Sequence, residues 1–562
     1  MNILGISCYY HDSAACLLQD GKVVAAVSEE RFNRIKNSEV FPINAINYCI
    51  QAGGIAFGDL DYIGFYEKPF LKFSRVIIDH IRAYPFSLRS FLERIPNWLK
   101  DRLVLPLILK KELGFDKKVF FVKHHLSHAA SAFLVSPFKE AAIITADGVG
   151  EWTTTTCGIG RGNDIKIIQE ITYPDSLGLL YTAVTSYLGF LAHQGEGKVM
   201  GLAAYGQPRY LDKFYKIIQP KPDGSFRINQ KFFGFNKGAR MYSRQFINLF
   251  GKNRKANEGI KQCHCDIAAS LQKVTEDTLI NIANSLYLNT KMDNLCLAGG
   301  VFLNCVANNK IIENTPFSKV YIQPAAGDSG GALGVACCIE NLILKRPRKF
   351  IMDSAYLGPE FSPIEIKRCL ITRNFKFTEF NEDELLEFVA KRILDNKIVG
   401  WFQGRSEYGP RALGNRSILA NPMFSGIKDL INKKVKKRES FRPYAPAILE
   451  EKMSEYFILT QHSPFMLLAG EVIAEKRELI PGVMHVDKTA RVQTVSKQVN
   501  PKFWRLIKAF ETLTGIPILL NTSFNLRGEP IVCTPNDAVG TFLNSEMDYL
   551  VIGDFIASRS EN

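Results

Sequence analysis

The chain has 562 residues, of which 46% are hydrophobic and 22% are charged. This composition is that of a globular protein and excludes a disordered, collagen-like or membrane-embedded chain. Its 70 Lys and Arg residues outnumber its 56 Asp and Glu residues, which gives a net charge of +14. This positive net charge is compatible with nucleic acid, an anionic membrane surface or phosphorylated ligands as partners.

The N-terminus and the cysteines predict a cytoplasmic protein. No Lys or Arg precedes Lys22, so the basic region of a signal peptide is missing. No uncharged apolar run approaches the roughly 20 residues that span a bilayer. The 12 cysteines are too sparse for a disulfide scaffold. We interpret the cluster Cys263–Cys265 as a helix start rather than a metal site, because no second cluster accompanies it.

A duplicated pattern appears in the first half of the chain. The first 32 residues predict three strands, with turns at His11–Ser13 and at Asp20–Gly21. Residues 141–171 repeat the pattern: an apolar strand ends at Asp147 and a Thr-rich strand returns. Two copies of this strand–turn–strand pattern predict a duplicated α/β unit with a ligand cleft between its halves. Actin-like folds use this arrangement to hold phosphates on hairpin turns.

Residues 66–112 interrupt the duplicated unit. They hold ten Lys or Arg and five Asp or Glu residues, interleaved with Phe70, Phe73, Phe86, Phe91 and Trp98. One interpretation is an amphipathic insertion that touches a partner, an acceptor substrate or a membrane surface. The other, which we favour, is a helical insertion whose apolar face packs on its own domain.

A connector is predicted near residue 350, because residues 343–362 combine mixed charge with two prolines. A new helix–strand–loop pattern follows it. We therefore predict a domain over residues 1–350, with the insertion 66–112, and a second domain over residues 351–562.

A metal site is predicted in the first domain. His124 and His128 are four residues apart, so on a helix they share one face. Asp147 ends a predicted strand, and Asp328 lies in a Gly-rich turn. Two His and two Asp suit Fe(II), Zn, Mn or Mg; simple packing of the His pair is the alternative. His125 stands where a zinc protease would need Glu, which excludes that class.

Gly-rich turns in the same domain predict a nucleotide site. GEGKVMGLAAYG carries Glu196 and Lys198, LCLAGGVFLN carries Gly300 and Asn304, and Gly327 opens GDSGG. Helix N-termini and glycine amides bind phosphate or ribose oxygens. The chain has no P-loop motif. We interpret GIGRG at 158–162 as part of a hairpin rather than a dinucleotide fingerprint.

Cations in the second domain are divided among four segments, interleaved with Pro, Gly and aromatic residues. This pattern predicts that they converge on a small polyanion, which guanidinium groups bind with two hydrogen bonds. The candidate ligands are Arg411, Arg416, Lys436, Arg491, Asn521 and Ser523.

These motifs carry a resemblance to a known family. They include YYHDSAA, SEERFNRIK, HHLSHAASAF, DGVGEW, GEGKVMGLAAYG, GDSGGALG, GPRALGNRS, FRPYAP and NTSFN. The chain resembles the O-carbamoyltransferases of nodulation-factor and antibiotic biosynthesis over nearly its whole length. The resemblance implies a mixed α/β (α+β) protein. Its N-terminal domain would be an actin-like (duplicated RNase H-like) metal domain, and its C-terminal domain a YrdC-like twisted sheet.

The resemblance also implies a two-step reaction. The C-terminal domain would make carbamoyl-adenylate from carbamoyl phosphate and ATP, with Mg²⁺ accompanying the ATP. The N-terminal domain would transfer the carbamoyl group to a hydroxyl of a sugar or natural product. A divalent metal, with Fe(II) favoured, would polarise the carbonyl, and His11 would be the general base. Lys36, as a further catalytic residue, would line the N-terminal nucleotide cleft with Glu196, Lys198, Gly300, Asn304 and Gly327.

Two other functions compete with this prediction. The first is a tRNA-modifying enzyme that makes threonylcarbamoyl-adenosine; the domain order and the C-terminal motifs disfavour it. The second is a nucleic-acid-binding protein, which only the net charge suggests, because no nucleic-acid-binding motif is present. We expect small-molecule substrates, no nucleic acid, no membrane span and a homodimer as a possible assembly. The sequence does not identify the acceptor.

Overall fold

The computed structural model describes residues 1–85, 87–235 and 240–559. The chain forms two compact units, which are described separately. Unit 1 comprises Met1–Ala26 and Glu39–Met352, and unit 2 comprises Val27–Ser38 and Asp353–Asn562. Our predicted domain of residues 1–350 had included residues 27–38. Their assignment to unit 2 has a physical cause, described with the site below.

The first sheet of unit 1 has five strands in the order β3-β2-β1-β4-β5. β1 pairs antiparallel with β2 and parallel with β4, and β4 pairs parallel with β5. The turn after β1 carries Tyr9 and Asp12 at positive φ. The strands are β1 (Asn2–Ser7), β2 (Ala14–Gln19), β3 (Lys22–Ser28), β4 (Tyr62–Phe65) and β5 (Val119–Phe121).

The second sheet of unit 1 repeats this topology, in the order β12-β11-β6-β7-β8. In both sheets the first strand lies in the centre, antiparallel to the second and parallel to the fourth. The repeated topology confirms the predicted duplicated α/β unit. The turn between β7 and β8 contains Gly162 at positive φ, as expected for a hairpin. The strands are β6 (Glu140–Ala146), β7 (Thr153–Arg161), β8 (Asp164–Thr172), β11 (Asn294–Ala298) and β12 (Lys319–Ile322).

Two helices that follow the fifth strand of each sheet pack against each other. They are α6 (His124–Phe133) and α13 (Ser329–Cys337). A Cβ atom on Gly334 would lie 1.9 Å from the Ser127 carbonyl oxygen, so glycine permits this close approach. The contact brings the N-terminal ends of α6 and α13 together. Predicted metal ligands lie at or next to each of these N-terminal ends.

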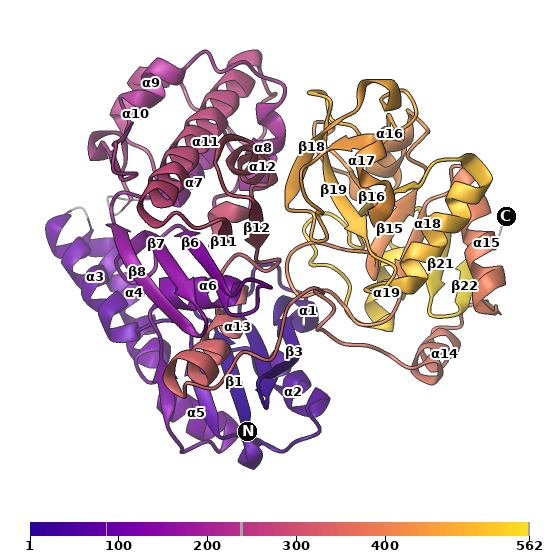
Figure 1. The fold of residues 1–562 in the computed structure, drawn as a ribbon, viewed down its shortest axis with the longest axis horizontal. Helices are drawn as coiled ribbons and strands as arrows, with labels where there is room; N and C mark the ends of the chain where they lie inside the picture. The colour runs from indigo at the N-terminus through magenta and orange to yellow at the C-terminus, as the bar shows by residue number, and fades with distance from the viewer. Residues whose placement is uncertain (86, 236–239, 560–562) are drawn as a thin grey trace. The chain divides into compact units, whose positions relative to one another are not determined.

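The remaining helices of unit 1 surround these sheets (Figure 1). The longest, α11, begins at Gln262, directly after Lys261, whose amide donates to the His264 ring nitrogen at 3.0 Å. His264 thus takes part in a helix start, as predicted for its Cys-His-Cys cluster. Bounds are α2 (Ile43–Ala52), α3 (Pro69–Arg82), α4 (Leu88–Asn97), α5 (Leu105–Leu113), α7 (Leu177–Tyr187), α8 (Glu196–Ala203), α9 (Leu211–Tyr215), α10 (Arg244–Phe250), α11 (Gln262–Thr290) and α12 (Cys305–Asn314).

Unit 2 is built on a ten-stranded mixed sheet, in the order β13-β22-β21-β14-β15-β20-β16-β19-β18-β17. The strands are β13 (Thr378–Glu379), β14 (Val399–Phe402), β15 (Arg416–Ala420), β16 (Ala445–Leu449), β17 (Phe457–Ile458), β18 (Leu468–Val472), β19 (Thr489–Val495), β20 (Ile518–Ser523), β21 (Tyr549–Ile552) and β22 (Phe555–Ser558). With the two sheets of unit 1, this confirms the mixed α/β class. The YrdC-like assignment of unit 2 stays a prediction.

The two longest helices of unit 2 each bury one apolar face. The buried residues of α15 (Glu382–Leu394) recur every three or four positions, beginning at Leu385 and ending at Ile393. In α18 (Pro501–Thr514) the buried residues recur in the same way, beginning at Phe503 and ending at Phe510. The other helices are α1 (Glu30–Asn33), α14 (Pro363–Thr372), α16 (Ile427–Ile431), α17 (Met453–Tyr456) and α19 (Pro535–Leu543).

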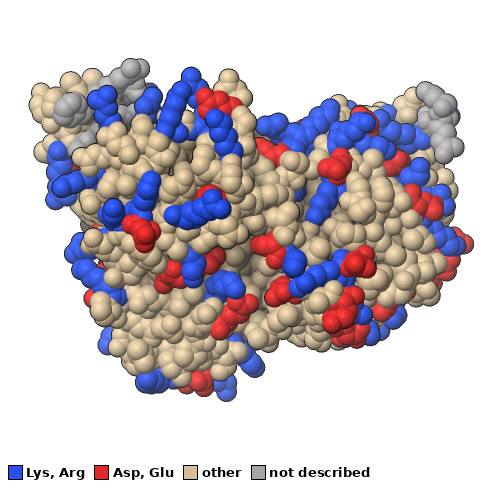
Figure 2. All heavy atoms as spheres, turned by 90° about the horizontal axis from the view of Figure 1, so that it is seen from above, with Lys and Arg blue, Asp and Glu red and all other residues tan. Residues whose placement is uncertain are grey.

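Two sequence predictions about the whole chain can be compared with the structure. None of the helices among the described residues is long and apolar enough to cross a membrane. The 12 cysteines all lie in the described part of the chain, and none forms a disulfide there. On the face that Figure 2 draws, Lys and Arg side chains form several separate groups with Asp and Glu among them.

Candidate functional site

The four predicted metal ligands converge in unit 1. His124 and His128 lie on one face of α6, Asp147 follows β6, and Asp328 directly precedes α13. One donor atom from each side chain lies within 4.8 Å of the others, and all four residues are buried. The duplicated topology produces this cluster, because each half contributes a strand end and a helix start to the same place.

The geometry inside the cluster suits a cation better than hydrogen bonds. The Nε2 atoms of His124 and His128 lie 3.1 Å apart, and each is within 3.2 Å of Asp147 Oδ2. Asp328 Oδ1 lies 3.7 Å from both Nε2 atoms and has no hydrogen-bond partner among the described residues. Lone pairs that converge in this way fit a divalent metal.

The Asp147 carboxyl is held ionised. Burial acts to raise its pKa, but hydrogen bonds from His124 and His128 outweigh burial and hold the pKa well below its ordinary value. An ionised, buried carboxylate next to two imidazoles is the form that binds a metal ion.

Residues around the cluster orient its members. The backbone amide of His124 donates to both carboxylate oxygens of Glu151, at 3.0 and 3.2 Å, which fixes the first turn of α6. The Tyr66 hydroxyl donates to Asp328 Oδ2 at 3.2 Å. A Cβ on Gly300 would lie 3.0 Å from Asp147 Oδ1. Glu151 and Tyr66 are not among the predicted site residues, although Glu151 lies in the DGVGEW motif.

His11 lies at the edge of the cluster, on the turn after β1. Its Nδ1 is 3.0 Å from Asp12 Oδ2 and 4.0 Å from Asp328 Oδ2, and 23% of its side chain is exposed. Burial lowers its pKa, but Asp328 and Asp12 outweigh burial and raise the pKa to about 10. The predicted general-base role needs the neutral imidazole, so it depends on a cation in the cluster that offsets Asp328.

The predicted nucleotide-binding residues of unit 1 divide into two groups. Gly300 and Gly327 lie beside the cluster, Gly300 next to Asp147 and Gly327 next to Asp12. Asn304 and Glu196 instead take part in hydrogen bonds within the protein: Asn304 caps α12. The partner side chains are Gln272 for Asn304 and Thr182 for Glu196, and Lys198 lies 5.7 Å from the Phe190 ring.

Lys36 does not join this group, because its segment belongs to unit 2. Arg34 donates to the carbonyl oxygens of Ile531 and Pro530 at 2.7 and 2.9 Å, and Arg31 donates to the Gly409 carbonyl oxygen at 2.7 Å. These bonds fix residues 27–38 to unit 2. The placement of Lys36 in the unit 1 nucleotide cleft stays a prediction.

Several cations of unit 2 lie close enough to repel one another. Burial lowers the pKa of Lys436 well below its usual value, and the charges of Arg438, Arg442 and Lys36 lower it further. Burial likewise lowers the pKa of Arg442 to about 10, with Arg438 and Arg491 contributing. Lys436 is buried, Arg438, Arg442 and Arg491 are half-buried, and Lys36 is exposed. A bound anion stabilises cations that repel one another in this way. We call Lys36, Lys436, Arg438, Arg442 and Arg491 the cation cluster.

Two predicted polar ligands adjoin this part of unit 2. The Lys436 ammonium donates to the Ser523 carbonyl oxygen, and its nitrogen lies 3.3 Å from Ser523 Oγ. Asn521 is buried: its Nδ2 donates to Gln493 Oε1 at 2.8 Å, and its Oδ1 has no partner among the described residues. Arg411 lies in the loop between β14 and β15, and the Ala412 carbonyl oxygen accepts from Asn521 Nδ2 at 3.3 Å.

Arg416, another predicted anion ligand, makes several contacts within unit 2. It is fully buried, stacks 3.7 Å from the Phe402 ring centre, and donates to the carbonyl oxygens of Gln403, Asn415 and Pro359. Burial lowers its pKa to about 10. Main-chain carbonyls thus accept from both terminal nitrogens, whereas Arg416 Nε has no partner among the described residues. The role of Arg416 as an anion ligand stays a prediction.

Glu407 shapes the loop that carries Arg411, and the sequence analysis did not identify it. Its Oε1 accepts hydrogen bonds from the backbone amides of Leu413, Asn415 and Arg416, at 2.8 to 3.1 Å. Gly409 and Gly414 take positive φ values of 115° and 106° in the same loop. The loop conformation therefore depends on one buried carboxylate and on glycine at both positions.

Removing the Glu407 carboxylate should destabilise unit 2. Glu407→Ala leaves three buried amides without an acceptor, which costs about 3 kcal/mol or more and lowers Tm by roughly 6–12 °C. Thermal unfolding followed by circular dichroism measures the shift. Glu407→Gln retains an acceptor oxygen and should shift Tm less; an equal shift for both variants would contradict this role of the carboxylate.

The cation cluster should bind a doubly charged anion less tightly as pH rises. Sulfate keeps its double negative charge from neutral to alkaline pH, whereas Lys436 binds it best when the ammonium is protonated. Because the Lys436 pKa is lowered, affinity should be constant below that pKa and fall as pH rises through it, toward the value of about 10 for Arg442. Calorimetric titration from neutral to alkaline pH tests this. Equal affinity at every pH would refute the prediction.

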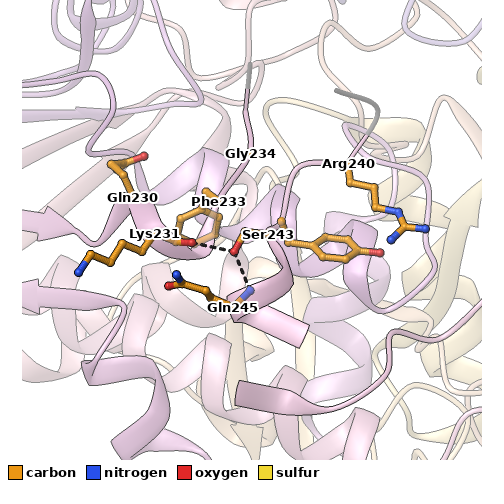
Figure 3. A pocket seen from close by; sticks show the side chains of 8 residues that line it. Gln230, Lys231, Phe233, Gly234, Arg240, Ser243 and Gln245 are labelled. Carbon is orange, nitrogen blue, oxygen red and sulfur yellow. Dashed lines mark hydrogen bonds between the residues drawn. The ribbon is translucent and has the colours of Figure 1, made fainter. Parts of the chain in front are cut away.

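A separate pocket of unit 1 contains none of the predicted site residues (Figure 3). It has a volume of about 610 Å³. Ser243 lies in its centre, donates to the Lys231 carbonyl oxygen at 2.7 Å and accepts from the Gln245 amide at 3.1 Å. Because this serine is occupied as a helix cap, the pocket offers no activated nucleophile.

Comparisons with known proteins show the family of the chain. Residues 2–337 match the family model described as carbamoyltransferase N-terminus, and residues 390–559 match that described as carbamoyltransferase C-terminus. Nodulation protein NolNO of Sinorhizobium fredii is 38% identical over 98% of this chain and 79% of its own length. Nodulation protein U of the same organism is 28% identical over 94% of both chains.

A third relative is the protein sll1178 of Synechocystis, which is 44% identical over 100% of this chain and 97% of its own length. Both family models match, one in each unit, and together they cover most of the chain. The protein therefore belongs to the carbamoyltransferase family and is a transferase.

Proposed function

We propose that the protein is an O-carbamoyltransferase that forms carbamoyl-adenylate from carbamoyl phosphate and ATP and transfers the carbamoyl group to an acceptor hydroxyl. The observation that carries the proposal is the cluster of His124, His128, Asp147 and Asp328 beside His11. It supplies a cation site and a proton-transfer group next to each other, which acyl-type transfer to a hydroxyl needs.

The first step is assigned to unit 2. Carbamoyl phosphate and ATP are both polyanions, and phosphoryl chemistry depends chiefly on positioning and charge compensation. The cation cluster provides that compensation, with Lys436, Arg442 and Arg491 as the principal groups. Mg²⁺ would accompany the ATP. Arg411 would approach the same anions from the loop that Glu407 holds.

The second step is assigned to unit 1. His11 accepts the proton of the acceptor hydroxyl as its oxygen attacks the carbamoyl carbon, and AMP leaves. Glu151 and Tyr66 hold His124 and Asp328 in place. His124, His128, Asp147 and Asp328 would hold a divalent metal, with Fe(II) favoured, that supplies Lewis-acid polarisation of the carbonyl. Gly300 and Gly327 leave space beside these residues for the adenylate.

Pyrophosphate release tests this proposal. The purified protein with ATP should release pyrophosphate when carbamoyl phosphate is added, and not when threonine and bicarbonate are added. Mass spectrometry should then show a carbamoyl group on a hydroxylated glycan acceptor. Pyrophosphate release that needs threonine and bicarbonate would instead indicate a threonylcarbamoyl-adenosine enzyme, and the absence of stimulation by carbamoyl phosphate would reject the proposal.

A further inference from the structure

The insertion of residues 66–112 contains a helix whose apolar face points outward. On α3, Phe70, Ile78 and Ile81 are exposed, with 71% of Phe70 and 69% of Ile81 accessible. Positions 70, 77, 78 and 81 share one face at helical spacing. The face that points inward carries charged and polar residues instead: Lys72, Arg75, Asp79 and His80. The interpretation that we favoured, an apolar face packed on its own domain, is wrong for this helix.

The inward polar face of α3 is fixed by paired groups. The Lys72 ammonium bonds to the buried Glu67 carboxylate and lies 4.5 Å from the Tyr10 ring centre. Arg75 lies 3.7 Å from Asp79. The Arg75 guanidinium also lies 5.3 Å from the Tyr173 ring centre. The Arg75–Asp79 pair lies within the helix, but rotation of the helix to bury its apolar face would break the contacts of Lys72 with Tyr10 and of Arg75 with Tyr173. The exposed apolar face is therefore a stable property of unit 1.

The neighbouring helix extends this surface. On α4 and the turn after it, Leu88, Leu92 and Leu99 are exposed at helical spacing, with 64% of Leu92 accessible. A ring contact joins His80 on α3 to Phe91 on α4, and another joins Phe73 on α3 to Trp98 in the turn after α4. Figure 1 shows α3 and α4 near each other. Phe86 lies outside the described residues. We call the exposed side chains of Phe70, Ile78, Ile81, Leu88, Leu92 and Leu99 the apolar surface.

Basic side chains accompany the apolar surface. Five described Lys and Arg residues of the insertion are exposed, whereas only two of its described acidic residues are, Asp101 and Glu112. Glu112 lies 3.2 Å from the Lys111 ammonium, so these two charges offset each other, and the exposed cations outnumber the exposed anions by three. The exposed cations are Lys68, Arg82, Lys100, Lys110 and Lys111.

We propose that the apolar surface docks the protein on an anionic lipid membrane. Large exposed aliphatic and aromatic side chains next to Lys and Arg are the combination that inserts at the boundary of acyl chains and acidic headgroups. A second copy of the chain fits less well, because two like-charged insertions would repel each other. The docking helix also reaches the site: Lys72 stacks on Tyr10, the residue before His11. Docking would therefore favour acceptors at a membrane surface.

Vesicle sedimentation tests the proposal with the full chain. The protein should bind vesicles of phosphatidylglycerol and phosphatidylcholine, bind pure phosphatidylcholine vesicles more weakly, and lose binding as salt is raised. The triple variant Phe70→Ser, Ile81→Ser, Leu92→Ser should bind anionic vesicles roughly tenfold less or weaker. A matched control is Ile364→Ser, Ile371→Ser, which removes two equally exposed side chains of α14 and should leave binding unchanged.

Pyrophosphate release in the same variants separates this proposal from the proposed function. The triple variant should keep full carbamoyl-phosphate-dependent release, which also shows that it folds. Equal vesicle binding by the triple variant and the native chain, or no binding by the native chain, would overturn the membrane proposal and leave the enzymatic one intact. A dimer in sedimentation velocity that the triple variant abolishes would also overturn it, in favour of self-association.

Discussion

His128→Ala should abolish carbamoyl transfer while carbamoyl-phosphate-dependent pyrophosphate release continues. The His128 Nε2 atom is within 3.2 Å of both the His124 Nε2 and Asp147 Oδ2 atoms, so its loss removes one of four convergent donors. We expect bound metal to fall and the transfer rate to drop by roughly 100-fold or more. Elemental analysis of the purified variant measures the metal, and product mass measures transfer from synthetic carbamoyl-adenylate.

His125→Gln is the matched control for this variant. His125 is buried on the same helix, but its Nδ1 bonds to Thr145 Oγ1 at 2.6 Å and it contributes no atom to the four-donor cluster. The control should therefore retain metal. If His128→Ala keeps its metal and its transfer rate, the cluster is a packing feature. If it loses both steps together, the assignment of the two steps to separate units fails.

The duplicated sheets and the convergence of the four donors were accessible from the sequence. Strand patterns and acidic turns recur in the same order, and the carboxyl ends of corresponding strands meet at one place in such a fold. His124 and His128 were recognisable because four residues make slightly more than one helical turn. Spacing within one helix or one repeated unit is local information, and local information is what a sequence displays.

The environment of the charged residues was not accessible from the sequence. Arg416 and Lys436 have the same charge, and both donate to main-chain carbonyls. Only Lys436 also lies among other cations that lower its pKa, and the sequence does not show this difference. Lys36 lies in unit 2 because Arg31 and Arg34 bind carbonyls about 400 to 500 residues away along the chain. Likewise, periodicity identified an amphipathic α3 but not which of its faces would be buried.

Lys436→Met should give the opposite result to His128→Ala. Removing the buried ammonium takes away a cation that a carbamoyl phosphate or ATP anion would bind. A charge-assisted hydrogen bond is worth about 2–3 kcal/mol, or roughly 30- to 160-fold in kcat/KM. Pyrophosphate release should fall by that factor, while transfer from synthetic carbamoyl-adenylate continues. Steady-state kinetics with carbamoyl phosphate as the varied substrate measures the loss.

Two further variants separate binding of the anion from support of the fold. Lys434→Met removes a lysine of the same turn whose ammonium lies 3.6 Å from Asp548, outside the cation cluster, and should leave pyrophosphate release unchanged. Lys436→Gln retains a donor for the Asn525 carbonyl oxygen, which accepts from Lys436 at 3.0 Å, but removes the charge. If the positive charge of Lys436 binds the anion, Lys436→Gln should lose as much pyrophosphate release as Lys436→Met. Its Tm should nevertheless be closer to that of the native chain. Recovery of pyrophosphate release by Lys436→Gln would show that Lys436 only supports the loop after β20, and the anion site would then have to lie elsewhere in unit 2.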